Sequence, residues 1–124
     1  EKNKAFVQKV ERETGREIRL GSYEEDLPSS LEKSDILVNA TNVGMLREES
    51  LLPDRTFLHA GLFVSDCIYH PMETKFLLQA KEQGLATMNG LPMLFYQAAE
   101  AFRLWTGKEM PEEIFGLLED AVRE

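Results

Sequence analysis

The chain has 124 residues, a formal net charge of −8 and a single cysteine. This length is enough for one domain with its own core. The negative charge would repel a phosphate backbone, so nucleic acid is not expected as a partner. No apolar run approaches the roughly 18 residues of a membrane span, so no membrane partner is expected either. Cys67 alone allows no disulfide within the chain, which favours a reducing cytoplasm.

The first third of the chain predicts two helices and two strands. Apolar residues at helical spacing end at Gly15, and the alternating segment Arg16–Gly21 predicts a short strand. Tyr23–Leu31 predicts a short helix that contains Pro28. Asp35–Thr41 is apolar without alternation through its centre, which is typical of a strand covered by helices on both faces.

The middle of the chain predicts a loop, a second strand and a capped helix. The range 44–53 is expected to be a loop, and Phe57 to Gly61 leads into a strand at Leu62–Tyr69. Thr74 can cap a helix that runs to Gln83.

The last third predicts a short strand at Ala86–Asn89 and two helices, which start near Pro92 and Pro111. The first of these helices is expected to end at Gly107. Strands alternate with helices throughout, so the fold class is α/β with a mostly parallel sheet and flanking helices.

Polar side chains close the two apolar strands, where ligands bind in open parallel sheets. Asn39 and Thr41 could fix a bound group or cap the strand end. Asp66 could act as a base, a metal ligand or a hydrogen-bonded structural carboxylate. Tyr69 could face a substrate or be a half-buried aromatic residue beside Pro71.

A second group of candidates follows the third strand. Gly90 can adopt positive φ and let a ligand approach the backbone, or it can be part of a plain turn. Gln97, near the start of the next helix, would point towards the same crevice. The eight glycines form no Gly-x-Gly-x-x-Gly loop, and no Lys–Asp pair or metal-ligand cluster stands at the strand ends.

Four ordered motifs carry a resemblance that runs from the first helix to about Pro111. They are Asp35-Ile-Leu-Val-Asn-Ala-Thr-Asn-Val-Gly-Met45, Asp66-x-x-Tyr69-x-Pro71-x-x-Thr74, Asn89-Gly90-x-x-Met93-Leu94-x-x-Gln97 and Ala101-Phe102-x-Leu104-Trp105-x-Gly107. In these motifs the chain resembles the C-terminal part of the shikimate dehydrogenase family, which includes quinate-using relatives.

The resemblance implies an NADPH-dependent enzyme that reduces 3-dehydroshikimate to shikimate. The family has an N-terminal substrate domain and a Rossmann-type cofactor domain, so residues 1–124 would be the C-terminal half of the cofactor domain. The family motifs imply that the cofactor lies beside Thr41, Asn42, Cys67 (mainly its backbone) and Gly90. They imply substrate contacts for Tyr69 and Gln97.

The chain departs from the family pattern in several places. Asn42 stands for a usual Pro or Ser, His70 for a common Asn, and Pro92 for a common Gly. No segment matches the family's catalytic lysine and aspartate. Its glycine-rich loop and Asn-Arg-Thr phosphate segment would lie before Glu1. We therefore assign no catalytic residue, and we expect this polypeptide alone to be inactive.

In the Rossmann strand order, loss of the first strands would bare one edge of the strand at Ile36–Ala40. We expect either a homodimer through that edge or refolding of Arg16–Gly21 against it. Two alternatives to a shikimate dehydrogenase remain open. They are a quinate dehydrogenase and a non-catalytic cofactor-sensing or assembly module.

Overall fold

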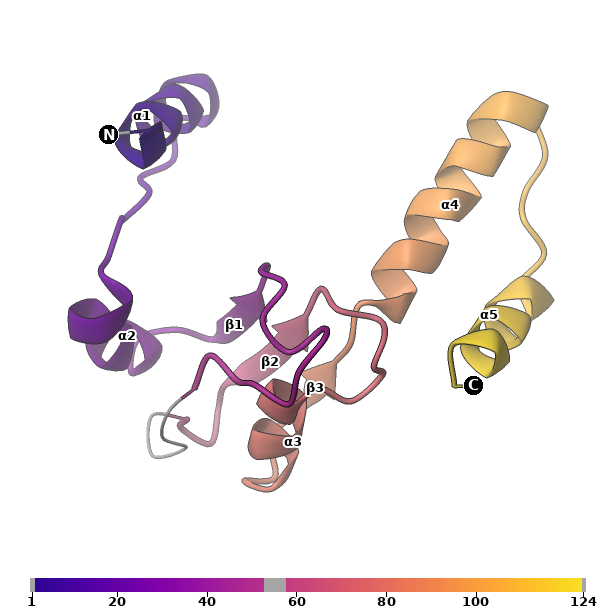
Figure 1. Ribbon diagram of the computed structural model, residues 1–124. Helices are drawn as coiled ribbons and strands as arrows, with labels where there is room; N and C mark the ends of the chain where they lie inside the picture. The colour runs from indigo at the N-terminus through magenta and orange to yellow at the C-terminus, as the bar shows by residue number, and fades with distance from the viewer. Residues whose placement is uncertain (1, 53–57, 124) are drawn as a thin grey trace.

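A three-stranded parallel sheet forms the centre of the computed structural model, which describes residues 2–52 and 58–123 (Figure 1). The strands are β1 (Ile36–Asn39), β2 (Phe63–Asp66) and β3 (Thr87–Met88), in the order β1-β2-β3. The α/β class with a parallel sheet is therefore confirmed, with strands shorter than expected. Pro53 and Phe57, which belong to the expected loop and lead-in segment, lie outside the described residues.

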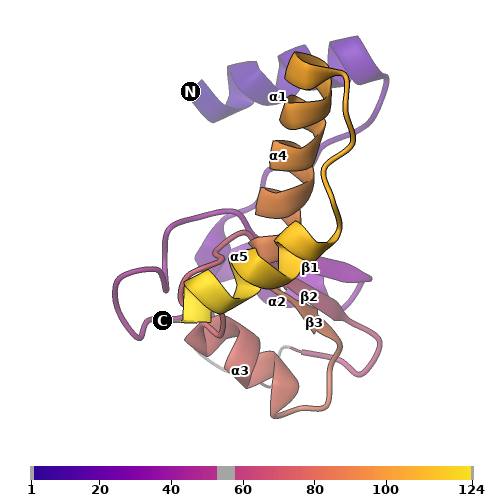
Figure 2. The same cartoon turned by 90° about the vertical axis from the view of Figure 1, so that its right-hand side faces the viewer.

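Helix α3 (Lys75–Lys81) covers one face of the sheet by packing against β2 and β3 (Figures 1 and 2). Thr74 caps this helix as expected, and Gly84 follows it with a φ of 74°. Phe76 of α3 and Val64 of β2 are almost fully buried. The apolar core therefore lies between β2 and α3.

The opposite face of the sheet is open. The register pairs Ile36 with Phe63 and Val38 with Ser65, so these side chains share one face. The exposed fractions of Ile36 and Val38 are 61% and 51%, and Met88 on the same face is 42% exposed. The expectation that helices cover both faces of β1 is wrong within the described residues, since only the α3 side is packed.

β1 is an edge strand, and the segment Arg16–Gly21 does not pair with it. This segment is irregular and mostly exposed, with Ile18 half-buried. The Ile18 amide donates to the carboxylate of Glu11 (2.9 Å), a contact within the N-terminal part of the chain. The predicted strand and its refolding onto β1 are both wrong, because alternation cannot form a strand without a partner.

The two N-terminal helices differ in how they meet the core. α1 (Lys2–Thr14) ends before Gly15, which has a φ of 67°, and lies away from the sheet (Figure 1). α2 (Tyr23–Leu31) is capped by Ser22 and buries Leu31 in the core. Both helices were expected from the sequence.

The two C-terminal helices form a hairpin beside the sheet. α4 (Leu91–Thr106) and α5 (Glu113–Arg123) touch through the rings of Phe95 and Phe115, whose centroids are 5.1 Å apart. The apolar stripe of α4 becomes exposed towards its end, where Trp105 is 84% exposed. None of the described helices is long and apolar enough to cross a membrane.

Candidate functional site

The carboxyl ends of β1 and β2 bring two buried polar side chains together. Asn39 and Asp66 are register partners, and each is only 1% exposed. The amide nitrogen of Asn39 donates to Asp66 Oδ1 (3.1 Å) and to the Val43 carbonyl (3.2 Å). The amide oxygen of Asn39 accepts from the backbone N–H (3.0 Å) and the hydroxyl (2.8 Å) of Thr41. Asn39 thus caps the strand end, one of its two predicted roles.

Both carboxylate oxygens of Asp66 accept hydrogen bonds from the protein. Oδ1 also accepts from the Ile68 amide (2.9 Å), and Oδ2 accepts from the hydroxyl of Thr74 (2.6 Å). These bonds satisfy a carboxylate that would otherwise be costly to bury. Of the three roles considered for Asp66, the geometry supports the hydrogen-bonded structural carboxylate.

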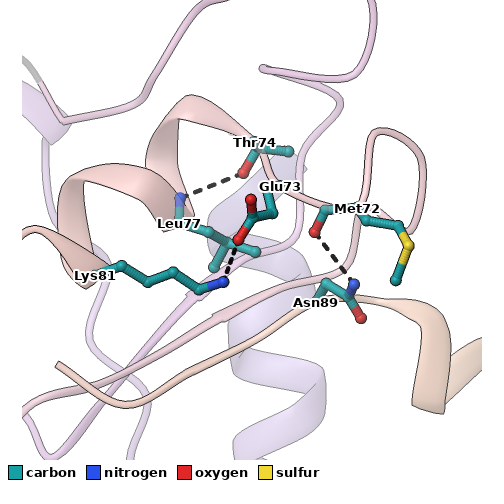
Figure 3. Close-up of polar contacts among 6 residues, drawn as sticks. All are labelled: Met72, Glu73, Thr74, Leu77, Lys81 and Asn89. Atoms are coloured by element: carbon teal, nitrogen blue, oxygen red, sulfur yellow. Dashed lines mark hydrogen bonds and ion pairs between the residues drawn. The ribbon is translucent and has the colours of Figure 1, made fainter. Parts of the chain in front are cut away.

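The loop between β2 and α3 is tied at three points (Figure 3). Thr74 accepts from the Leu77 amide (3.3 Å), while Glu73 pairs with Lys81. Asn89, after β3, donates to the carbonyl of Met72 (3.1 Å). The bond from Thr74 to Asp66 and the bond from Asn89 to Met72 were missed by sequence reasoning, which saw in Thr74 only a helix cap. The one sequence signal that could have predicted these contacts was the presence of polar residues at the ends of adjacent parallel strands.

Gly90 packs directly against the backbone that follows β2. Its φ is −78°, so the positive φ considered from the sequence is wrong. A Cβ at this position would lie 2.1 Å from the carbonyl oxygen of Cys67. The Gly90 amide also donates to the Ile68 carbonyl (2.9 Å). Glycine is required here because the backbone of residue 90 contacts the backbone of residue 67, whether or not a ligand also approaches this position.

The remaining candidates lie after β1, after β2 and on α4. The hydroxyl of Thr41 donates to Asn39 and accepts from the Val43 amide (3.1 Å), and Asn42 beside it is exposed. Tyr69, just beyond Cys67, is 40% exposed. Gln97 is exposed on α4, and its amide donates to the carbonyl of Leu94 in the same helix (3.1 Å).

A hollow of about 480 Å³ opens between the loop after β1 and the start of α3. It is lined by Gly44, Met45, Leu46, Arg47, Glu48, Pro71, Glu73, Thr74, Lys75 and Leu78. The six predicted binding residues lie outside this lining. Five of them, Thr41, Asn42, Cys67, Tyr69 and Gly90, follow the carboxyl ends of the strands and are called the ledge below, whereas Gln97 lies on α4.

The parallel sheet, its flanking helices and the polar carboxyl edge define a Rossmann-like α/β protein. The family model described as the shikimate 5′-dehydrogenase C-terminal domain matches residues 90–115. A shikimate dehydrogenase (NADP⁺) of Streptococcus pneumoniae strain Hungary19A-6 is 48% identical over 115 residues, which are 91% of this chain and 40% of that protein.

Two solved structures extend the comparison. A Listeria monocytogenes shikimate 5-dehydrogenase in complex with shikimate and NAD is 37% identical, with a TM-score of 0.86 over 96% of this chain and 42% of that one. A Corynebacterium glutamicum quinate dehydrogenase in complex with NAD is 29% identical, with a TM-score of 0.78 over 94% and 40%. The chain belongs to the shikimate dehydrogenase family, and it spans about 40% of the length of the curated relatives that it matches.

Proposed function

We propose that the chain supplies the C-terminal part of an NADP-dependent shikimate dehydrogenase, which reduces 3-dehydroshikimate to shikimate. The 48% identity to the Streptococcus pneumoniae enzyme over 115 residues carries this proposal. The polar carboxyl edge of the sheet supports it, since ligands of open α/β sheets bind there.

The proposed roles of the ledge residues and of Gln97 are those that the family motifs imply, and the chemistry of these residues is compatible with them. Thr41, Asn42, Cys67 and Gly90 would hold the nicotinamide end of the cofactor, which supplies the hydride. These four residues carry no charged side chain, and the contact between Gly90 and Cys67 leaves only backbone on one side. The Thr41 hydroxyl already donates to Asn39, so towards a ligand it would act as an acceptor.

Tyr69 and Gln97 would contact the substrate. The phenol of Tyr69 would face the carboxylate region, and the amide of Gln97 would hydrogen-bond a hydroxyl group. Both side chains are exposed enough to be reached without opening the core. One N–H of the Gln97 amide donates to the Leu94 carbonyl, so the second N–H and the amide oxygen would serve the substrate.

The 124 residues would form the C-terminal half of a dinucleotide-binding domain. The catalytic lysine, its aspartate and the phosphate-binding loops of the family have no match in this sequence. We therefore expect the isolated polypeptide to bind NADPH weakly and to give no turnover.

A chimera tests the function directly. The aligned part of the Streptococcus pneumoniae relative is replaced by residues 1–124, and NADP⁺-dependent oxidation of shikimate and of quinate is followed by absorbance. We expect turnover of shikimate with a clear preference over quinate. A preference for quinate would favour the quinate dehydrogenase alternative, and a folded but inactive chimera would favour the non-catalytic module.

Gln97→Ala in the same chimera is expected to raise the KM for shikimate about tenfold, the cost of one lost hydrogen bond to the substrate. Gln83→Ala is the matched control, because Gln83 is an exposed glutamine beyond the end of α3. Equal KM values for the two variants would contradict the role of Gln97.

We also propose a cytoplasmic location and, for the isolated chain, a homodimer. The single free cysteine supports the first proposal. The unpaired edge of β1 supports the second, since edge strands readily pair with other chains.

A further inference from the structure

The backbone of Cys67 and Ile68 is held from three sides. The Cys67 amide donates to the carbonyl of Asn39 (2.9 Å), and the Ile68 amide donates to Asp66 Oδ1 (2.9 Å). The Ile68 carbonyl accepts from the Gly90 amide (2.9 Å), and the Cys67 carbonyl lies against Gly90. Of these partners, only Asp66 holds the peptide through a side chain.

The carboxylate of Asp66 also sets the direction of the neighbouring hydrogen bonds. A carboxylate only accepts, so the amide of Asn39 must turn its nitrogen towards Asp66 and its oxygen towards Thr41. For the same reason the hydroxyl of Thr74 must donate to Asp66, which leaves its lone pair for the Leu77 amide. One side chain therefore orders the turn after β1, the peptide after β2 and the start of α3.

We propose that Asp66 is a positioning residue for the nicotinamide end of the cofactor. It acts through the Cys67–Ile68 peptide and through the orientation of Thr41. This inference rests on the proposed function. An asparagine in its place would present one acceptor oxygen and one donor nitrogen. With the oxygen towards Ile68, the nitrogen would face Thr74, so the Thr74 hydroxyl would lose its acceptor and that hydrogen bond would have to reverse its direction.

The test compares the chimera that carries residues 1–124, called the wild type here, with its Asp66→Asn variant by backbone NMR, with nicotinamide mononucleotide as the probe. In the ligand-free state, we expect the Ile68 amide to exchange its hydrogen about tenfold faster in Asp66→Asn, because a charge-assisted bond becomes a neutral one. In the wild type we expect the probe to shift the amides of Thr41, Cys67 and Gly90. In the variant these shifts should weaken at least about threefold.

Glu73→Gln is the matched control, because it removes a carboxylate charge in the loop that follows, from an exposed side chain paired with Lys81. It should resemble the wild type in both readouts. Thr74→Ser, which keeps the hydroxyl, should also resemble the wild type. Thr74→Val should reproduce part of the Asp66→Asn effect, and it provides the same comparison if Asp66→Asn does not fold.

The outcomes separate the two claims. If the Ile68 exchange and the probe shifts of a folded network variant match the wild type, the positioning role is overturned and the proposed function stands. The role is also overturned if the variant only loses stability while the probe shifts keep their pattern and size. If the probe leaves Thr41, Cys67 and Gly90 unchanged in the wild type, the proposed cofactor site is overturned, and with it the role of Asp66 in that site.

Discussion

At Gly90 one hydrogen atom stands where any other residue would place a carbon. A Cβ would lie 2.1 Å from Cys67 O and 2.5 Å from its carbonyl carbon, distances at which backbone must move. The sequence suggested this glycine for the approach of a ligand. The close contact arises from the packing of two strand ends, which no local pattern reveals.

We expect Gly90→Ala to lower the free energy of unfolding of the chain by about 3 kcal/mol, at the upper end of the cost of overpacking. Urea denaturation followed by circular dichroism measures the difference. Gly116→Ala is the control: a Cβ at this helical position meets nothing within 4 Å, and stability should rise by up to about 1 kcal/mol. Equal midpoints for the two variants would show that the strand ends can separate freely.

The sequence predicted some of the polar residues of the site, but not the contacts between them. Asn39 and Asp66 stood out because each interrupts an apolar strand, and both proved to be buried and bonded to each other. Their mutual contact depends on the register of β1 and β2, which is a long-range property. The contribution of Thr74 was hidden for the same reason, since it reaches Asp66 across the intervening loop.

Among the elements, α5 is held to the rest of the chain by few contacts. It has no fully buried residue, and it contacts α4 through the perpendicular rings of Phe95 and Phe115. A second contact joins His70 Nδ1 to the carbonyl of Val122 (3.2 Å). Helices of this length need tertiary packing to persist.

Phe115→Ala should therefore release α5 and leave the sheet intact. We expect amide hydrogen exchange within α5 to accelerate about tenfold, since an aromatic pair and its buried area are lost. Amides of β2 should keep their wild-type rates. Leu117→Ala, at a side chain that is 65% exposed on the same helix, should change neither set. Faster exchange in β2 after Phe115→Ala would mean that α5 supports the core.

Helices were easier to predict than strands in this chain. The capping residue Thr74 and the helix-ending glycine Gly107 are local sequence signals, and the structure has a helix beginning or ending at each of them. The segment Arg16–Gly21 alternates as well as a strand should, yet no described strand lies beside it. A strand forms only when its backbone pairs with a neighbouring strand, so an alternating pattern alone was insufficient to predict one.

For the molecule as a whole, the open side of the sheet is the surface through which we propose that the isolated chain forms a dimer. Within residues 2–52 and 58–123, one edge of β1 has no strand partner, and Ile36 and Val38 present apolar side chains next to it. The net charge of −8 opposes association at low salt, and salt screens that repulsion. Self-association should therefore strengthen as salt is added.

Val38→Lys should keep the chain monomeric, because a charged residue on an edge strand discourages pairing. Light scattering across a concentration series at 0.15 M salt measures the mass, and the wild type should approach the mass of a dimer. Leu117→Lys adds the same charge on α5, where the side chain is also exposed, and should not prevent the dimer. A wild type that stays monomeric at high concentration would contradict association through β1.

The contact between Gly90 and Cys67 has a mechanical consequence. Gly90 is the residue from which α4 starts, and Cys67 is the first residue after β2. With only main-chain atoms between them, no flexible group can absorb a small shift. A displacement of the first turn of α4 should thus move the C-terminal end of β2 by a similar amount, so that the two segments behave as one rigid unit.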